Sequence, residues 1–251
     1  MRFMMMHKVD AAMESGAIPS PEVMERMGAF MEESVRSGQL LGGEGLRPSK
    51  TRTQLTFRRG DVTIKDGPYA GGNELPARVA LIKVKTREEA LDWATRYGKA
   101  LGDGELELGP INEAWDLGLM PRPDDAPLRF LLIHKADAAH EAGTSPSAGQ
   151  KAAMTQLTGE MLRADVLVSI VNLERSSKAA RVKLAGRRRT VVDGPFAESK
   201  ELIAGYGLLE LPSKEAAIEA ASKFAAVFGP DVVMEIDVRP LGEDPYAEQA
   251  G

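Results

Sequence analysis

The sequence predicts an α+β protein made of two copies of one βαββαβ unit, with the sheets of the two copies packed face to face. The stretch Asp193-Gly-Pro-Phe-Ala-Glu-Ser-Lys-Glu201 has a partial copy, Asp66-Gly-Pro-Tyr-Ala-Gly-Gly-Asn-Glu74, 127 residues earlier (193 − 66). The same offset relates further pairs without a gap. Both copies also show the same order of strand-like and helix-like patterns. A repeat of this length is a domain rather than a solenoid unit.

Composition indicates a globular chain and excludes several kinds of site. The chain has 251 residues, enough for two domains that each bury a core. Its net charge of −5 argues against general binding to nucleic acid or to an anionic membrane. Absence of cysteine excludes thiolate catalysis and cysteine metal sites, and the three histidines lack metal-ligand spacing. We therefore expect no metal and no cofactor.

No stretch is apolar for long enough to span a bilayer. The apolar run at the amino terminus stops at His7, which is too soon for the hydrophobic region of a signal peptide. These features predict a cytoplasmic protein.

Each copy is expected to begin with a strand followed by a helix. Residues 2–9 and 128–136 are apolar runs typical of strands that are buried on both faces. Ser20 before Pro21 predicts a helix start, and Gly38 is placed to end that helix. A second strand and a polar hairpin follow in each copy and lead to the Asp-Gly-Pro turn. The strand candidates are 39–46 and 166–173, and the hairpin arms are 54–58, 61–65, 181–184 and 190–192.

The remainder of each copy reads strand, helix, strand. The first of these strands, 78–85 or 202–211, is rich in Val, Ile and Leu. A capping box that starts at Thr86, with Ser213 at the matching place, predicts the helix. The order is that of a ferredoxin-like unit, whose helices lie on one face of an antiparallel sheet. The other face would be covered by the sheet of the other copy, which makes a barrel-like pseudo-dimer within one chain.

The predicted domain boundaries follow from this order. We expect a first repeat at 1–114, a proline-rich linker at 115–127, a second repeat at 128–242 and a flexible acidic tail at 243–251.

The stretch Thr190-Val-Val-Asp-Gly-Pro-Phe-Ala-Glu-Ser-Lys-Glu-Leu-Ile-Ala-Gly205 resembles the signature of the YCII-related family, DGPF type, in a tandem duplication. Residues 135–143 and Leu40-Leu-Gly-Gly-Glu-Gly-Leu46 share the resemblance. It implies a dimeric α/β-barrel with ligand clefts beside the sheet interface, and for some members an association with sigma factors. It also implies a His and an Asp paired for acid–base chemistry. Met27 and Met154 stand near the place of that His, and neither can move a proton.

The candidate catalytic residues are His7 and His134, each of which precedes a lysine at the end of a predicted strand. A strand histidine is more often a core residue than a catalyst. A neighbouring cation would lower the histidine pKa and favour a neutral base. Lys8 and Lys135 could hold a carboxylate or a phosphate. His140 has no counterpart in the first copy, where Met13 stands at its place.

The candidate ligand-binding carboxylates have structural alternatives. Asp66 and Asp193 begin Asp-Gly-Pro turns, in which Asp bonds its own backbone. Glu198 and Lys200 crowd the start of a strand that should be buried, or else lie in a solvated loop. The remaining candidates are Glu44, which stands between glycines, and Glu14 and Glu141, which lie in the loop after the first strand of each copy.

These observations favour a protein that binds, or transforms by acid–base chemistry, a small polar or anionic molecule in a cleft near the sheet interface. Whether it is an enzyme stays open. The alternative is a regulatory or adaptor protein that binds a sigma factor or another protein without catalysis. A third interpretation is that one half only supports the other, and further self-association is also left open.

Overall fold

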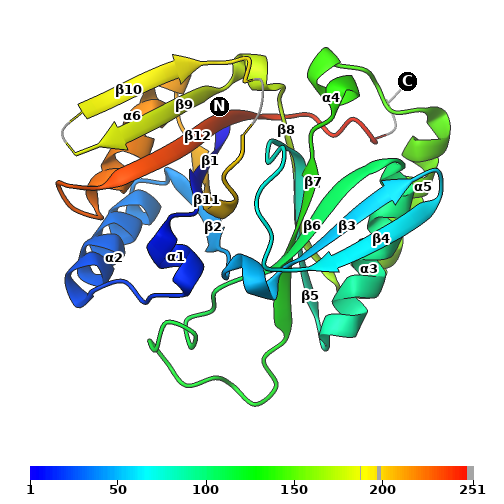
Figure 1. The fold of residues 1–251 in the computed structure, drawn as a ribbon, viewed down its shortest axis with the longest axis horizontal. Helices are drawn as coiled ribbons and strands as arrows, with labels where there is room; N and C mark the ends of the chain where they lie inside the picture. Colours follow the sequence, from blue (N-terminus) through cyan, green and yellow to red (C-terminus); the bar gives the residue numbers. More distant parts are fainter. Residues whose placement is uncertain (187, 197–198, 248–251) are drawn as a thin grey trace.

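The computed structural model describes residues 1–186, 188–196 and 199–247 of the chain. Within these residues the architecture is mixed α+β, with six α-helices and a large antiparallel sheet of 12 strands (Figure 1). None of the described helices is long and apolar enough to cross a membrane.

The elements of the first half follow the predicted order, with an additional short helix after the first strand. They are β1 (Arg2–Lys8), α1 (Ala11–Ser15), α2 (Pro21–Arg36), β2 (Leu40–Gly45), the 3-10 helix η1 (Ser49–Thr51), β3 (Thr53–Arg58), β4 (Asp61–Asp66), β5 (Pro76–Val84), α3 (Arg87–Leu101) and β6 (Gly104–Pro110).

The second half has the same order of elements. They are β7 (Leu128–Lys135), α4 (Ala138–Ala142), α5 (Ala148–Arg163), β8 (Leu167–Leu173), the 3-10 helix η2 (Ser176–Lys178), β9 (Ala180–Ala185), β10 (Arg188–Asp193), β11 (Ile203–Glu210), α6 (Lys214–Ala226) and β12 (Val233–Gly242).

Local capping residues explain where the helices begin. Ser20 caps α2 by accepting from the amide of Val23, and Thr86 caps α3 by accepting from the amide of Glu89, as the sequence predicts. The loop expected after β1 instead holds α1, because Asp10 caps its first turn and Gly16 ends it in the left-handed conformation, with φ 80°. Helix α4 has the same two features.

Strand pairing differs from the expectation that each half makes its own sheet. Strand β1 lies between β11 and β12, and β2 pairs with β11 at the edge. Conversely, β7 lies between β5 and β6, and β8 pairs with β5. The first two long strands of each half are therefore built into the sheet of the other half. Hydrophobic patterns locate strands but do not distinguish between two similar neighbours, so the sequence leaves this choice open.

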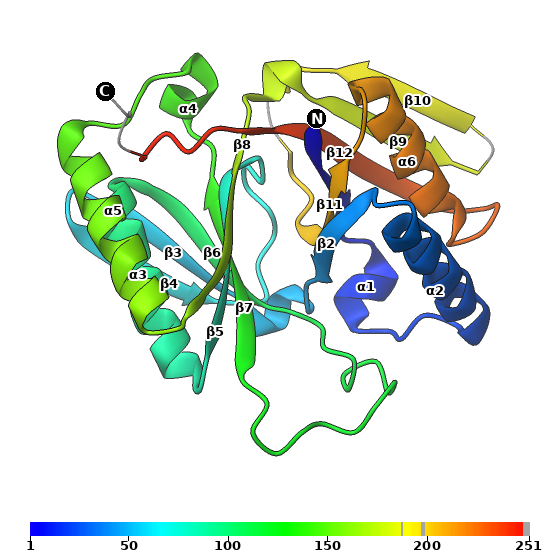
Figure 2. The ribbon, with the colours of Figure 1, turned by 180° about the vertical axis from the view of Figure 1, so that it is seen from behind.

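Both faces of these strands are buried, as the apolar runs predict. Helices α2 and α6 cover one group of strands, and α3 and α5 cover the other (Figures 1 and 2). A third apolar cluster lies on the opposite faces, where side chains from the two groups meet. It includes Met4, Met6, Val79, Leu81, Leu131, Ile133, Leu173 and Ile203. Pairing of β12 with β8 and a bridge between Leu46 and Ile111 join the two groups.

Two segments outside these elements differ in how they contact the rest of the protein. Residues 112–127 contain no helix or strand; Glu113 and Asp116 pair with Arg129 and Arg47, and the segment then loops out from the body (Figure 1). The tail was expected to be flexible from residue 243 onward, yet residues 243–247 lie along the protein. Their contacts are an ion pair between Asp244 and Arg78 and packing of Tyr246 against the core that α3 and α5 cover. Residues 248–251 lie outside the described residues.

Two helical glycines should respond oppositely to alanine. A Cβ atom at Gly28 in α2 would have no neighbour within 4 Å, whereas one at Gly98 in α3 would lie 2.1 Å from the ring of Phe57. We expect Gly28→Ala to raise the free energy of unfolding by about 0.5–1 kcal/mol. Gly98→Ala should lower it by about 1–3 kcal/mol through overpacking. Urea unfolding measures both changes, and a shift of the same sign in both variants would contradict this packing.

Candidate functional site

Three polar side chains form a row across the neighbouring strands β8, β5 and β7, near one end of each strand. Arg78 in β5 pairs in register with Asn172 in β8 on one side and with His134 in β7 on the other. Because side chains alternate along a strand, Arg78 lies on the same face as Ala80 and Ile82, whose side chains pack under α3 and α5. The row therefore lies on the same face of the sheet as the core under α3 and α5, next to the apolar residues of that core.

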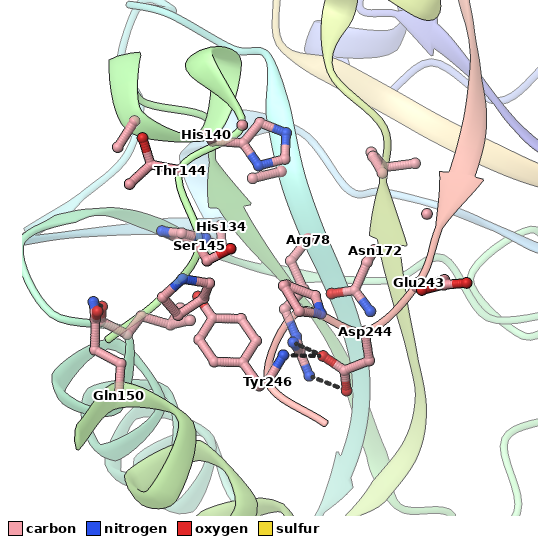
Figure 3. Close-up of a pocket in the computed structure, with 18 of the residues that line it drawn as sticks. Arg78, His134, His140, Thr144, Ser145, Gln150, Asn172, Glu243, Asp244 and Tyr246 are labelled. Carbon is pink, nitrogen blue, oxygen red and sulfur yellow. Dashed lines mark hydrogen bonds and ion pairs between the residues drawn. The ribbon is translucent and has the colours of Figure 1, made fainter. Parts of the chain in front are cut away.

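A cleft of about 720 Å³ opens over this row. Helix α4 contributes His140 to its wall, the start of α5 contributes Gln150, and the tail contributes Asp244 and Tyr246 (Figure 3). Strands from both halves thus form the floor of one cleft. Its volume lies in the range of small-molecule sites in proteins.

The guanidinium of Arg78 is the central charge of the cleft. Only 2% of Arg78 is exposed, and it donates two hydrogen bonds to the carboxylate of Asp244, at 2.8 and 3.4 Å. The ring of Tyr246 lies against its face, with the ring centre 4.8 Å from Cζ. In this structure, then, a carboxylate meets the edge of the Arg78 guanidinium and an aromatic ring meets its face.

Three polar atoms in residues that line the cleft are buried without a hydrogen-bond partner among the described residues. They are Nε of Arg78, Oδ1 of Asn172 and Nε2 of His140. Buried polar atoms are nearly always paired in folded proteins, with protein groups or with water, so each such atom calls for an explanation. They comprise one donor, one acceptor and one imidazole nitrogen.

Both histidines of the cleft are held in the neutral form at pH 7. Burial lowers the pKa of His134 to about 4, with Asp137 opposing this shift and His140 and Arg78 adding to it. Burial also lowers the pKa of His140, and the positive charge of Arg239 lowers it further. A neutral imidazole can accept a proton or a hydrogen bond from a ligand.

The corresponding row in the other group of strands offers no such arrangement. In register there, Gly205 in β11 pairs with His7 in β1 and with Gly45 in β2. The ring of His7 packs against Phe224 at 5.2 Å between centroids, and burial lowers the pKa of His7 to about 4. A Cβ atom at Gly205 would lie 2.7 Å from Cε1 of His7, so this row has no room for an arginine.

The structure places the two candidate lysines in buried ion pairs and not in the cleft. The ammonium of Lys8 lies 3.2 Å from Asp237, and that of Lys135 lies 2.5 Å from Glu74. Adjacent strand residues point to opposite faces, so Lys135 projects away from the cleft into which His134 faces. Proximity in sequence does not bring these two residues together at one site.

Glu14 and Glu141 hold corresponding positions in the two halves. Glu14 accepts hydrogen bonds from the amide and hydroxyl of Ser49 in η1, and Glu141 accepts the same bonds from Ser176 in η2. Both carboxylates therefore fix the backbone that follows the second strand of each half.

The Asp-Gly-Pro turns pack directly on these serines. A Cβ atom at Gly67 would lie 1.8 Å from the carbonyl oxygen of Ser49, and one at Gly194 would lie 1.7 Å from that of Ser176. Only glycine permits so close an approach. The carboxylates of the same turns, in contrast, are exposed. Asp66 accepts from Thr53 and Arg87, and Asp193 accepts from Lys214.

The remaining candidates lie apart from the cleft or outside the described residues. Glu44 pairs with Arg129 at 2.7 Å, and burial raises its pKa, whereas Arg129 opposes that shift. The backbone of Lys200 packs against Gly71, where a Cβ atom would lie 1.8 Å from the Lys200 carbonyl oxygen. Glu198 lies outside the described residues.

Among the sequence candidates that the structure describes, His134 alone lines the cleft, while Arg78, Asn172 and Asp244 were missed and His140 received little weight. A signal for two of them was present. At the offset of 127 residues, Arg78 corresponds to Gly205 and Asn172 to Gly45, so a large polar residue replaces glycine twice. A charge inside an apolar strand is itself unusual unless it is paired.

Among the described residues, no group of three or more His, Asp or Glu side chains could hold a metal ion. The fold and cleft together define an α+β protein with a polar site on a helix-covered sheet face. Residues 129–241 match the YCII-related domain. This segment runs from β7 into β12, so it supplies His134, His140 and Asn172, whereas Arg78 and Asp244 lie outside it. No curated protein and no solved structure matches the chain.

Proposed function

We propose that the cleft over Arg78 binds a small anionic or polar molecule. The observation that carries this proposal is a cleft of about 720 Å³ lined by a buried guanidinium, that of Arg78, and by Asn172 and His140, whose buried atoms Oδ1 and Nε2 have no hydrogen-bond partner among the described residues. A guanidinium binds carboxylate or phosphate through two parallel hydrogen bonds. Oδ1 of Asn172 can accept from a hydroxyl or amino group of the same ligand.

Chemical transformation at this site would use His134 as the general base. Its imidazole is neutral at pH 7 and lies next to Arg78 in the row. A base with a pKa near 4 is weak, so it would act on a proton already made acidic by binding beside Arg78. The role of His7, the other candidate, as a general base stays a prediction.

We also propose that the chain is a tandem duplication of a DGPF-type repeat, folded as an intramolecular dimeric α/β-barrel. Support comes from the equal offset between the first residues of α1 and α4, of α2 and α5, and of η1 and η2. The pairing of β12 with β8 and the Leu46–Ile111 bridge would close the barrel. In this arrangement the two repeats exchange their first strand, helix and second strand.

Replacing Arg78 tests the proposed binding. Acetate, benzoate and inorganic phosphate serve as probes, with binding measured by calorimetry and by NMR of the backbone amides around Asn172. Arg78→Met should weaken binding of any probe that binds the wild type by about 10- to 100-fold, because a hydrogen-bonded charge pair is lost.

Arg36→Met is the matched control, since Arg36 is exposed on α2 and pairs with Glu33 of the same helix. It should leave binding unchanged. Absence of binding by every probe, or equal binding by the Arg78→Met variant with an unchanged thermal unfolding curve, would refute the proposed site.

The adaptor function stays a prediction, as does a cytoplasmic location. An adaptor would bind a purified sigma factor with an affinity that Arg78→Met leaves unchanged, because the cleft would take no part. A ligand-binding protein would instead show loss of small-molecule binding in the same variant.

A further inference from the structure

Residues 243–247, called the tail here, line one side of the cleft. After β12, residues 243–247 turn over β5, so that Asp244 meets the edge of the Arg78 guanidinium and Tyr246 meets its face (Figure 3). The amide of Tyr246 donates to Oδ1 of Asp244 at 3.0 Å, which holds the two side chains on the same arginine. The tail thus presents one carboxylate and one aromatic ring to Arg78.

The tail is held less firmly than the body of the protein. The Arg78 side chain is 2% exposed, whereas that of Asp244 is 41% exposed. Both partners of the Lys135–Glu74 pair are, by contrast, 4% exposed. Beyond Arg78, the tail's described polar contact with the body is a bond of 3.4 Å from Thr155 to the carbonyl of Tyr246. An ion pair whose carboxylate is 41% exposed is partly screened by water, so it holds the tail less firmly than a fully buried pair would.

We propose that residues 243–247 are a displaceable occupant of the cleft, and that the ligand they give way to is a carboxylate bearing an aromatic ring. This inference rests on the proposed function of the cleft. The tail shows which groups Arg78 can bind: a carboxylate at the edge of the guanidinium and an aromatic ring on its face. A single small molecule that carries both groups can replace them without the cost of ordering a chain segment.

Displacement has a quantitative consequence for affinity. A ligand that needs Arg78 binds only the fraction of molecules in which the tail is released, so its apparent dissociation constant is raised by the inverse of that fraction. Weakening the tail contact should therefore tighten ligand binding. For a tail that is bound nine-tenths of the time, the gain is about tenfold.

The experiment compares probes on the full chain and on tail variants. Benzoate and phenylacetate carry both groups, cyclohexanecarboxylate lacks the aromatic ring, and inorganic phosphate lacks both the ring and the carboxylate. In Asp244→Asn the tail keeps its shape but loses its charge, and benzoate should bind about tenfold more tightly than to the wild type. On the wild type, benzoate should also shift the backbone amide resonance of Tyr246 as the tail leaves.

Asp165→Asn is the matched control. Asp165 is an exposed carboxylate that pairs at 2.8 Å with Lys83, another cation of β5, and it lies away from the cleft. This variant should bind benzoate as the wild type does. Tyr246→Ala provides a second tail variant with the same expected direction, so that the test holds even if one variant folds poorly.

Each outcome bears on one part of the proposal. Equal affinity of the wild type, Asp244→Asn and Tyr246→Ala for benzoate, with loss of binding in Arg78→Met, would overturn the displaceable tail while the proposed binding site stands. Equal binding of cyclohexanecarboxylate, phosphate and benzoate would overturn the aromatic carboxylate as the ligand class. If no variant with Arg78 intact binds any probe, the proposed function itself fails.

Discussion

Replacing Glu74 by alanine is expected to lower the free energy of unfolding by about 3–5 kcal/mol. The carboxylate of Glu74 lies 2.5 Å from the ammonium of Lys135, and both side chains are 4% exposed. Glu74 also accepts from the amide of Gly72 at 2.8 Å. The variant leaves an uncompensated cation in the interior, and the cost of that burial exceeds the cost of losing the contact itself.

Urea unfolding at pH 7.5 measures this loss, and two further variants establish its cause. The double variant Glu74→Leu with Lys135→Met removes both charges and should recover most of the lost stability. Glu219→Ala breaks an exposed pair with Arg189 and should change the free energy of unfolding by less than about 1 kcal/mol. A loss below about 1 kcal/mol in Glu74→Ala would show that the Lys135–Glu74 pair is not buried as described.

Stability should also fall as the pH is lowered from about 6.5 towards 4, through His7 and His134. Burial lowers the pKa of each from 6.5 to about 4. Between these values the unfolded chain binds protons that the folded protein excludes, so acid favours unfolding. The stability that these neutral histidines contribute is present above pH 6.5. At pH 5 the free energy of unfolding should be lower than above pH 6.5 by about 2 kcal/mol for each histidine.

Urea unfolding of the wild type at pH 7.5 and at pH 5 tests this dependence. The double variant His7→Gln with His134→Gln should lose much less stability over the same interval, because glutamine does not titrate. Carboxylates remain largely ionised at pH 5, so their contribution over this interval is small. An equal loss in the double variant and the wild type would mean that both histidines keep ordinary pKa values.

Much of the secondary structure is predictable because its signals are local. Ser20 and Pro21 at the start of α2, and Thr86 with Glu89 at the start of α3, act within one helical turn. The apolar run in residues 2–9 predicts burial on both faces of β1, because neighbouring side chains of a strand point in opposite directions. Such signals depend on no distant partner.

The site was predictable only in part. His134 was identified as a candidate, but its neighbours in the row come from β5 and β8, which are separated in sequence from β7. Comparing the residue types of the two halves of the sequence does not give the register between strands. Register decides which side chains share a face. The pairing of His134 with Lys135 was misleading for the same reason, since the two residues face opposite sides of one strand.

The two Asp-Gly-Pro stretches show which features are local and which depend on tertiary structure. Sequence alone determined that they are turns, that they occur twice at one offset, and that strands follow them, because turn chemistry and periodicity are short-range properties. Only the tertiary structure decided that Gly67 and Gly194 must lack a side chain, since the carbonyls of Ser49 and Ser176 approach them from outside the turn. Only the tertiary structure decided that β1 and β2 join the strands of the second half and that β7 and β8 join those of the first. It also decided that Asp244 reaches Arg78, because such contacts depend on packing between segments far apart in the chain.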